Sequence, residues 1–238
     1  MIEEAYRQFG RKKPNDLEVC ECCMDPQTRR EFFNHPIRDL PLHDLREWYF
    51  AAADPGWVSQ PLWQYLLPRI LEVLAAGEPV SEISVEISLS RHTTGDPALW
   101  SAAQWAVLDQ FQRRFLERAM IPANPSAGRL AHLRLDDALC MFRLSGWPLL
   151  DLIAQVTAMP GLALAERLWH DWCGDFWPGY GAIALTSFWP AGDNTLVHDF
   201  YTSLALQERM EALVLAEDAA PLVAEHALAV MQVIADNR

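Results

Sequence analysis

The sequence predicts an all-α protein built as an irregular stack of helices, and three observations support this prediction. Apolar residues recur at the spacing of three and four positions that one helix face requires. Prolines and glycines interrupt these stretches at intervals typical of helices of about 11 to 20 residues, and only one short segment alternates as a strand does. Such a succession is typical of stacks of the HEAT or armadillo type, although no repeat of fixed length is visible.

Composition and charge limit the classes of function. Of the 238 residues, 51% are hydrophobic, which is enough for a sizeable core. Nineteen basic and 32 acidic residues give a formal net charge of -13, which repels nucleic-acid phosphates and anionic membranes and favours a basic partner. No apolar leader follows Met1 and no run of about 18 apolar residues occurs, so we expect neither secretion nor membrane insertion. We therefore expect a cytoplasmic protein.

An N-cap, helical spacing and a turn sequence predict the first two helices. Asp25 followed by Pro26 is a typical cap and first helical residue, and this pair predicts a short helix over 26–33. Residues 41–53 carry leucine, tyrosine and alanine at helical spacing, and the turn sequence at 54–56 ends this second helix.

A third helix is predicted from Ser59 or Gln60 to about Leu74, since a serine precedes Pro61 and apolar residues follow on one face. Pro68 lies inside this pattern. We expect a kink there, because proline removes one backbone donor and crowds the preceding turn.

Residues 80–89 are the segment that alternates like a strand, with β-branched residues at many of its apolar positions. A single strand would have no partner for its backbone groups, so we predict a short helix that begins near Ser81 and Glu82. After a polar turn, the clearest helix of the chain is predicted over 97–120.

Residues 121–128 are the best candidate linker, because two prolines among small polar residues cannot continue a helix. We therefore predict two helical lobes, 1–120 and 129–238. Residues 177–194 are expected to form a longer irregular loop. Further helices of the second lobe are expected over 133–145, 148–159, 162–176, 195–206, 207–217 and 219–237.

The cysteines Cys20, Cys22 and Cys23 form the sharpest candidate for chemistry. The spacing between the first and last of them can place two thiolates on one zinc ion. A structural zinc site usually has a second such pair, whereas this chain offers only isolated histidines such as His35 and His43. We therefore favour free thiols and expect no cofactor, with zinc at this cluster as the alternative. Acidic neighbours would raise the thiol pKa values, which argues against a reactive nucleophile.

No catalytic motif is present in the sequence: it has no paired-histidine zinc motif, nucleophile elbow, phosphate loop or dinucleotide fingerprint. His170-Asp171 is an adjacent pair whose side chains diverge on a helix. Asp136-Asp137 is expected to cap or solvate the first turn of its helix. We therefore expect no catalytic residues and a function in binding.

The ten tryptophans are the most informative residue type, and four of them fall between residues 169 and 189, beside acidic residues. Core packing is the alternative for each. Aromatic anchors within an acidic rim are nevertheless typical of a protein-binding hot spot for a basic partner. The predicted partner contacts are Trp169, Asp171, Trp172, Asp175, Trp177, Trp189 and Asp193.

Residues 20–77 contain the cysteine-rich start CECC, the helix DLREWYFAA and the segment LWQYLLPRILEVLAAG, which is similar to a helix of the type FLPRILEL. Through these motifs they resemble a group of small uncharacterised bacterial all-helical proteins. No residue role follows from this resemblance. Small acidic helical proteins of this kind often accompany bacterial toxins as immunity proteins, so the resemblance implies a protein partner.

Charge and resemblance together predict a cytosolic immunity protein that binds and neutralises a cognate, basic toxin domain, with no direct contact to nucleic acid or membrane. One alternative is a metal-dependent hydrolase, or an enzyme that reverses a toxin's modification, with histidine and aspartate residues brought together by the fold. A second alternative is a helical adaptor stapled by zinc at Cys20 and Cys23.

Overall fold

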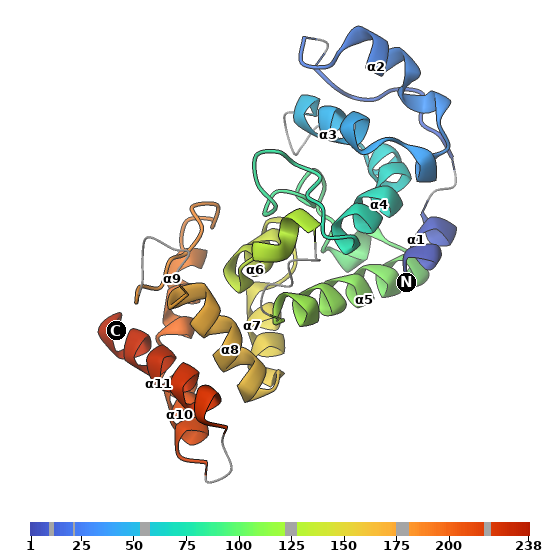
Figure 1. Ribbon diagram of the computed structural model, residues 1–238. Helices are drawn as coiled ribbons and strands as arrows, with labels where there is room; N and C mark the ends of the chain where they lie inside the picture. The colour runs from blue at the N-terminus through green and yellow to red at the C-terminus, as the bar shows by residue number, and fades with distance from the viewer. Residues whose placement is uncertain (10–11, 21, 53–57, 122–127, 175–180, 217–219) are drawn as a thin grey trace. The chain divides into compact units, whose positions relative to one another are not determined.

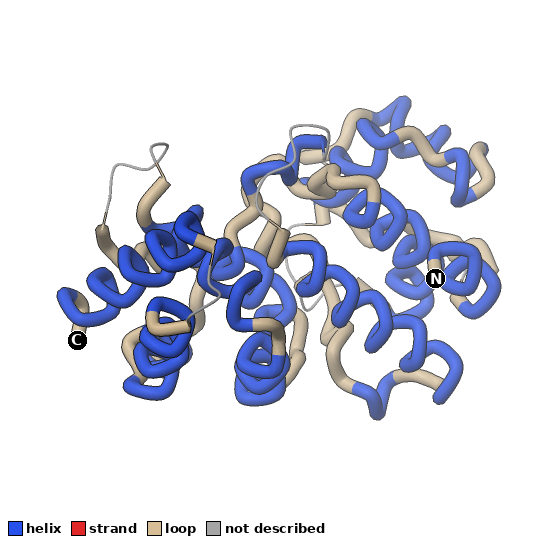
Figure 2. Tube along the Cα trace, turned by 60° about the horizontal axis from the view of Figure 1, so that its bottom comes forward, coloured by secondary structure: helices blue, strands red, loops and turns tan. Residues whose placement is uncertain are grey.

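The computed structural model describes residues 1–9, 12–20, 22–52, 58–121, 128–174, 181–216 and 220–238. Within these ranges every regular element is a helix and none is a strand, which confirms the all-α prediction (Figure 2). The chain forms two compact units. Unit 1 comprises Met1–Phe115, Pro125–Ala131 and Met141–Trp147, and unit 2 comprises Leu116–Asn124, His132–Cys140 and Pro148–Arg238. Each unit takes residues from both sides of the linker predicted at 121–128, of which 122–127 lie outside the described residues.

Unit 1 is built around helix α4 (Figure 1). Ser59 caps this helix, since its Oγ accepts a hydrogen bond from Leu62 N at 3.4 Å, and Pro68 lies inside it as predicted. Asp25 caps α2 through bonds from Gln27 N and Thr28 N. The α-helices are α1 (Ile2–Gln8), α2 (Pro26–Glu31), α3 (Leu42–Ala51), α4 (Gln60–Ala75) and most of α5 (Ala102–Ala119), joined by the short helices η1 (Phe32–Asn34), η2 (Ile37–Asp39) and η3 (Pro97–Leu99). The tight turn η4 (Gly128–His132) follows α5.

The core of unit 1 is aromatic. Trp48 and Trp63 are fully buried, with ring centroids 6.5 Å apart. A buried indole needs a partner for its N–H group. Trp48 Nε1 donates to Leu17 O at 2.9 Å, and Trp63 Nε1 donates to Thr94 Oγ1 at 3.0 Å. These bonds fix the loops that cover the two helices.

The short helix predicted over 80–89 is wrong, because this segment folds as a series of turns. Backbone bonds from Ser88 N to Val85 O and from Ser90 N to Ile87 O close single turns, and other bonds to its carbonyl groups come from side chains. The hydroxyl of Tyr49 donates to Ile87 O, and Thr94 Oγ1 donates to Leu89 O at 2.9 Å. Side chains outside the segment thus supply part of the bonding that a helix or strand would provide.

Unit 2 consists of the first part of α6 (Leu135–Leu144), then α7 (Leu149–Ala158), α8 (Gly161–Trp172), α9 (Asp193–Tyr201), α10 (Leu204–Val214) and α11 (Pro221–Asp236). Helices α8, α10 and α11 pack against one another (Figure 1). The rings of Trp169 and His226 stack at 3.9 Å and join α8 to α11. The ring of Trp172 meets that of Tyr201 edge-on at 5.2 Å and joins α8 to α9.

No single helix in the described part of the chain is long and apolar enough to cross a membrane. Helices α7 and α8 reach that length and composition only as a pair, and they are bent by 114° at the break between them.

Candidate functional site

The residues predicted to contact a partner fall largely in the interior of unit 2. Asp171, Trp172 and Trp189 are 6%, 4% and 8% exposed, whereas Trp169 and Asp193 are half-buried. These three side chains have little surface that a partner could contact, and the contacts predicted for them stay a prediction. Two further predicted contacts, Asp175 and Trp177, lie outside the described residues.

Asp171 holds the start of α6 in place. Its Oδ2 accepts bonds from Leu135 N at 3.0 Å and from Arg167 Nε at 3.2 Å, and its Oδ1 is paired with Arg167 Nη2. Burial raises the pKa of Asp171 to about 6, and the charge of Arg167 acts in the opposite direction. The role of this carboxylate is therefore to join α8 to α6 inside unit 2.

Asp136 binds the loop 181–192 to α6. Its Oδ2 accepts a bond from Thr186 N at 2.6 Å, and its Oδ1 accepts one from Trp189 Nε1 at 3.0 Å. Burial raises the pKa of Asp136 to about 7, while both donors lower it. The prediction that Asp136 is solvated is thus wrong. Asp137 does cap the helix as predicted, because its Oδ2 accepts a bond from Arg134 N at 3.2 Å.

The surface of unit 2 is strongly acidic. By sequence, unit 2 holds 15 acidic and five basic residues, against 17 and 14 in unit 1, so ten of the 13 excess negative charges belong to unit 2. Its basic side chains serve internal contacts: Arg167 pairs with Asp171, Arg209 Nη1 donates to Thr157 O at 2.7 Å, and Arg238 Nε donates to Thr202 O at 3.1 Å. These contacts leave little positive charge to balance the exposed carboxylates.

Exposed leucines accompany the exposed glutamates on the three helices that pack together in unit 2. Along α10 and its C-cap residue Leu215, the residues Leu204, Glu208, Glu211 and Leu215 follow at spacings of four, three and four, so they share one face. Leu204 and Leu215 are 59% and 72% exposed. The acidic–leucine stripes, as we call these residues, are Leu162 and Glu166 on α8, the four residues on α10, and Leu222, Glu225 and Leu228 on α11. Their glutamates have no ion pair within the described residues.

The sequence pattern does not distinguish these stripes from a core, because leucine at helical spacing usually indicates a buried face. A usable signal was nevertheless present in α10. Its leucines exceed what one face needs, since Leu206 and Met210 fill the buried face and Leu204 and Leu215 lie on another. Apolar residues on two faces of one helix indicate a second surface that another molecule can cover.

In unit 1 the structure brings the three cysteine thiols together. The Sγ atoms of Cys20, Cys22 and Cys23 all lie within 4.8 Å of one another. A hydrogen bond from Cys23 N to Cys20 O at 3.1 Å closes a tight turn. A hydrogen bond with Cys22 lowers the pKa of Cys20, and the hydrogen bond with Cys20 raises that of Cys23 to about 11. Such a group of thiols can hold a soft metal ion.

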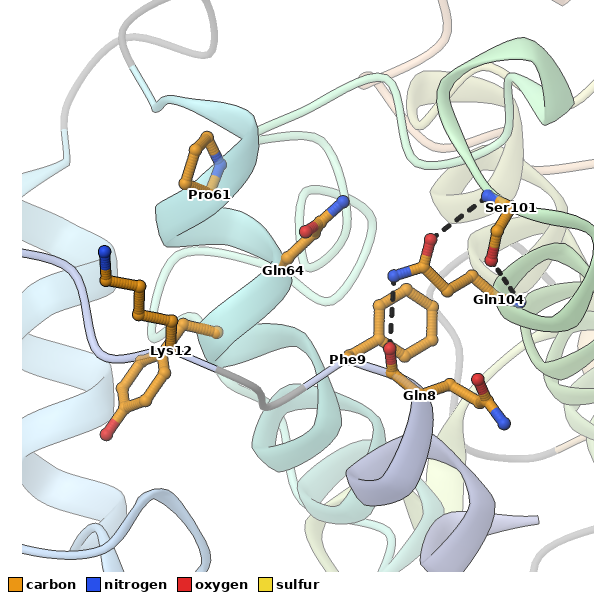
Figure 3. A pocket seen from close by; sticks show the side chains of 8 residues that line it. Gln8, Phe9, Lys12, Pro61, Gln64, Ser101 and Gln104 are labelled. Carbon is orange, nitrogen blue, oxygen red and sulfur yellow. Dashed lines mark hydrogen bonds between the residues drawn. The ribbon is translucent and has the colours of Figure 1, made fainter.

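Unit 1 also has a pocket of about 350 Å³ between α1, α4 and the start of α5 (Figure 3). Gln104 Nε2 donates to Gln8 O at 3.2 Å, and Gln104 Oε1 accepts from Ser101 N at 3.1 Å. The amide of Gln64 has no hydrogen-bond partner within the described residues, and Lys12 adds an ammonium group at the rim. Amides and an ammonium suit hydrogen bonding to a small polar ligand.

Comparisons with protein-family models, with curated proteins and with solved structures found no match to this chain. The class of protein is therefore defined by the fold and the sites alone. It is an all-α protein with an acidic, leucine-bearing helical surface on one unit and a cluster of exposed thiols on the other.

Proposed function

We propose that this chain is a cytosolic immunity protein, which binds a basic toxin domain through the acidic–leucine stripes of unit 2 and thereby neutralises it. The observation that carries this proposal is the charge of unit 2, which has ten of the 13 excess negative charges. An acidic surface whose carboxylates lack internal partners attracts a basic protein and accelerates their encounter.

The leucines and the glutamates contribute to different steps of binding. Burying an exposed leucine contributes about 1.5 to 3 kcal/mol, which slows dissociation. Carboxylates at the edge of an interface act mainly on the association rate. The exposed leucines Leu204 and Leu215 beside Glu208 and Glu211 supply both on a single helix, which supports protein binding by α10.

Neutralising a toxin by covering its active-site surface requires no catalytic residue in this chain. A toxin that acts on nucleic acids needs a basic surface at its active site, because that surface binds phosphate groups. An acidic protein that covers the same surface competes with the nucleic acid for it. The partner class that fits unit 2 is therefore a basic nuclease-like domain.

The experiment begins with capture of the toxin by the tagged full-length chain at low salt, with the products of neighbouring genes as candidates. Association and dissociation rates are then measured with the purified partner. We expect the double variant Glu208→Lys and Glu211→Lys to lower the association rate at least about tenfold at low salt, and much less at high salt, because ions screen exposed charges.

The matched control changes the same charge on unit 1 through Glu31→Lys and Asp39→Lys, both exposed positions. We expect this control to leave binding within about twofold, since rim charges act locally at physiological ionic strength. Leu204→Ala and Leu215→Ala are expected to raise the dissociation rate about tenfold each. If the charge reversals on unit 1 and unit 2 lowered the association rate equally, net charge alone would explain the effect. That result would overturn the proposed surface.

A further inference from the structure

The three cysteines at the surface of unit 1 contradict the usual behaviour of this residue type. Free cysteine is among the most buried residues. Cys140 and Cys173 follow this rule at 0% and 4% exposed. Cys22 and Cys23, in contrast, are exposed, and Cys20 is half-buried beside them. Packing in the core therefore does not account for the cluster.

The loop that carries the cluster is held against α3. On its N-terminal side Leu17 is buried and its carbonyl accepts the bond from Trp48 Nε1, and Cys20 N donates to Ala51 O at 3.1 Å. On its C-terminal side Met24 is buried, and Asp25 caps α2. The thiols are thus gathered before any ligand arrives, and this arrangement lowers the entropic cost of binding one.

We propose that Cys20, Cys22 and Cys23 bind one thiophilic metal ion, Zn²⁺, through three thiolates, with the fourth coordination position open to water or to a ligand from another molecule. This inference concerns unit 1 and goes beyond the partner binding proposed for unit 2.

The sulfur positions fit this coordination. A Zn–S bond of about 2.3 Å in tetrahedral geometry places sulfur atoms about 3.8 Å apart. Here Cys22 Sγ lies 3.6 Å from Cys23 Sγ and 2.8 Å from Cys20 Sγ, and all three lie within 4.8 Å. The Cys20–Cys22 pair has to open by about 1 Å, which rotation about side-chain bonds can supply.

The donor set is limited to three in the part of the chain that the structure describes, since no histidine or carboxylate joins the sulfur group. His43 is paired with Asp44, and Glu47 accepts the bond from Asp25 N. Three protein ligands with an open fourth position are typical of zinc sites that bind a further molecule, whereas structural sites are closed by four. A divalent ion also offsets three thiolate charges better than Cu⁺ does.

Binding of Zn²⁺ to the three thiols releases their protons. Each thiol that loses its proton forms one sulfur–metal bond, so one Zn²⁺ ion displaces up to three protons into solution and no electron is transferred. The affinity for Zn²⁺ should therefore rise with pH, and buffer acidification should accompany the titration.

The test uses the reduced, metal-free, full-length chain, titrated first with Co²⁺ and then with Zn²⁺. We expect one equivalent of Co²⁺ to produce thiolate-to-cobalt charge-transfer absorption together with the visible bands of tetrahedral Co²⁺, and one equivalent of Zn²⁺ to abolish both. Each of Cys20→Ser, Cys22→Ser and Cys23→Ser should lower Zn²⁺ affinity at least about 100-fold, since losing a ligand costs more than losing an outer partner, which costs 10- to 100-fold.

Cys173→Ala is the matched control, because it removes a buried thiol of unit 2 and should leave the Zn²⁺ affinity unchanged. Far-UV circular dichroism checks that the serine variants keep their helices, as substitutions at exposed and half-buried loop positions should. The proposal is overturned if the native chain gives no charge-transfer band, if the serine variants bind like the native chain, or if Cu⁺ binds while Co²⁺ shows no tetrahedral spectrum. None of these results bears on partner binding by unit 2.

Discussion

The central tryptophans of unit 1 and the buried aspartates of unit 2 are held by different kinds of bond. Unit 1 holds its central tryptophans through neutral hydrogen bonds, from Trp48 to Leu17 O and from Trp63 to Thr94 Oγ1. Unit 2 buries the carboxylates of Asp136 and Asp171, the second of which is paired with Arg167. A neutral hydrogen bond is unchanged between pH 5 and 8, whereas a buried carboxylate titrates within that range when burial raises its pKa. Two similarly packed helical units can therefore differ strongly in how their stability depends on pH.

The largest loss of stability is expected from a substitution in the aromatic core of unit 1. Trp63→Ala should lower the free energy of unfolding by about 4 kcal/mol, because it opens a cavity and leaves Thr94 without its indole donor. Urea titration measures the loss. Trp105→Ala, at a half-buried position, is the control and should cost clearly less. Equal costs would mean that the core does not centre on Trp63.

The second largest loss of stability is expected from a substitution in the buried ion pair of unit 2. Arg167→Met should cost about 3 kcal/mol, because Asp171 stays buried without its cation. Adding Asp171→Asn should restore part of this loss, since the amide oxygen can still accept the bond from Leu135 N. Hydrogen exchange of the amides in α8 and α11 measures both variants. A double variant that is less stable than Arg167→Met alone would contradict the account of an uncompensated charge.

The pH dependence of stability should separate the two units directly. Burial raises the pKa of Asp136 to about 7 and that of Asp171 to about 6, both above the ordinary value of 3.8. The folded unit 2 therefore binds protons more tightly than the unfolded chain, and its stability should fall as pH rises from 5 to 8, with Asp136 alone contributing on the order of 2 kcal/mol.

Fluorine NMR of fluorotryptophan-labelled protein in urea can follow the unfolding of each unit at several pH values. Asp136→Asn should flatten the slope of unit 2, whereas Asp151→Asn, at an exposed position, should leave it unchanged. A steeper slope in unit 1 than in unit 2 would reverse the comparison.

The smallest expected effect concerns surface charge. Glu208→Gln with Glu211→Gln should stabilise unit 2 by about 0.5 kcal/mol or less at low salt, because it relieves repulsion on an acidic unit. Glu31→Gln in unit 1, where charges are nearly balanced, should change stability less. Thermal unfolding at low and high salt measures both, and the difference should vanish at high salt.

The elements that were predicted correctly are those with local signals. Ser59, Pro61 and the apolar stripe of α4 lie within one stretch, and the helix forms where they predict it. The helix predicted over 80–89 is wrong because the conformation of this segment depends on Tyr49 and Thr94, which lie outside it. No spacing within ten residues reports such bonds.

The same limit applies to the site in unit 2. The sequence places Asp171 between Trp169 and Trp172, a pattern that suits a contact surface and a core equally well. Arg167 lies four residues earlier on the same helix, so this ion pair could be expected from the sequence, but only the fold brings Leu135 N to Asp171 Oδ2 and buries the carboxylate. The cysteines, in contrast, are close in sequence, and their proximity in space follows from a short turn.

The proline within α4 has a consequence for the pocket of unit 1. Pro68 has no N–H group, so the carbonyl of Gln64, four residues earlier, lacks the donor that a regular helix would give it. Gln64 is also the residue whose side-chain amide stands without a partner in the pocket (Figure 3). Gln64 therefore has a main-chain carbonyl without its usual helical donor, and its side-chain amide can bind a water molecule or a polar ligand in the pocket.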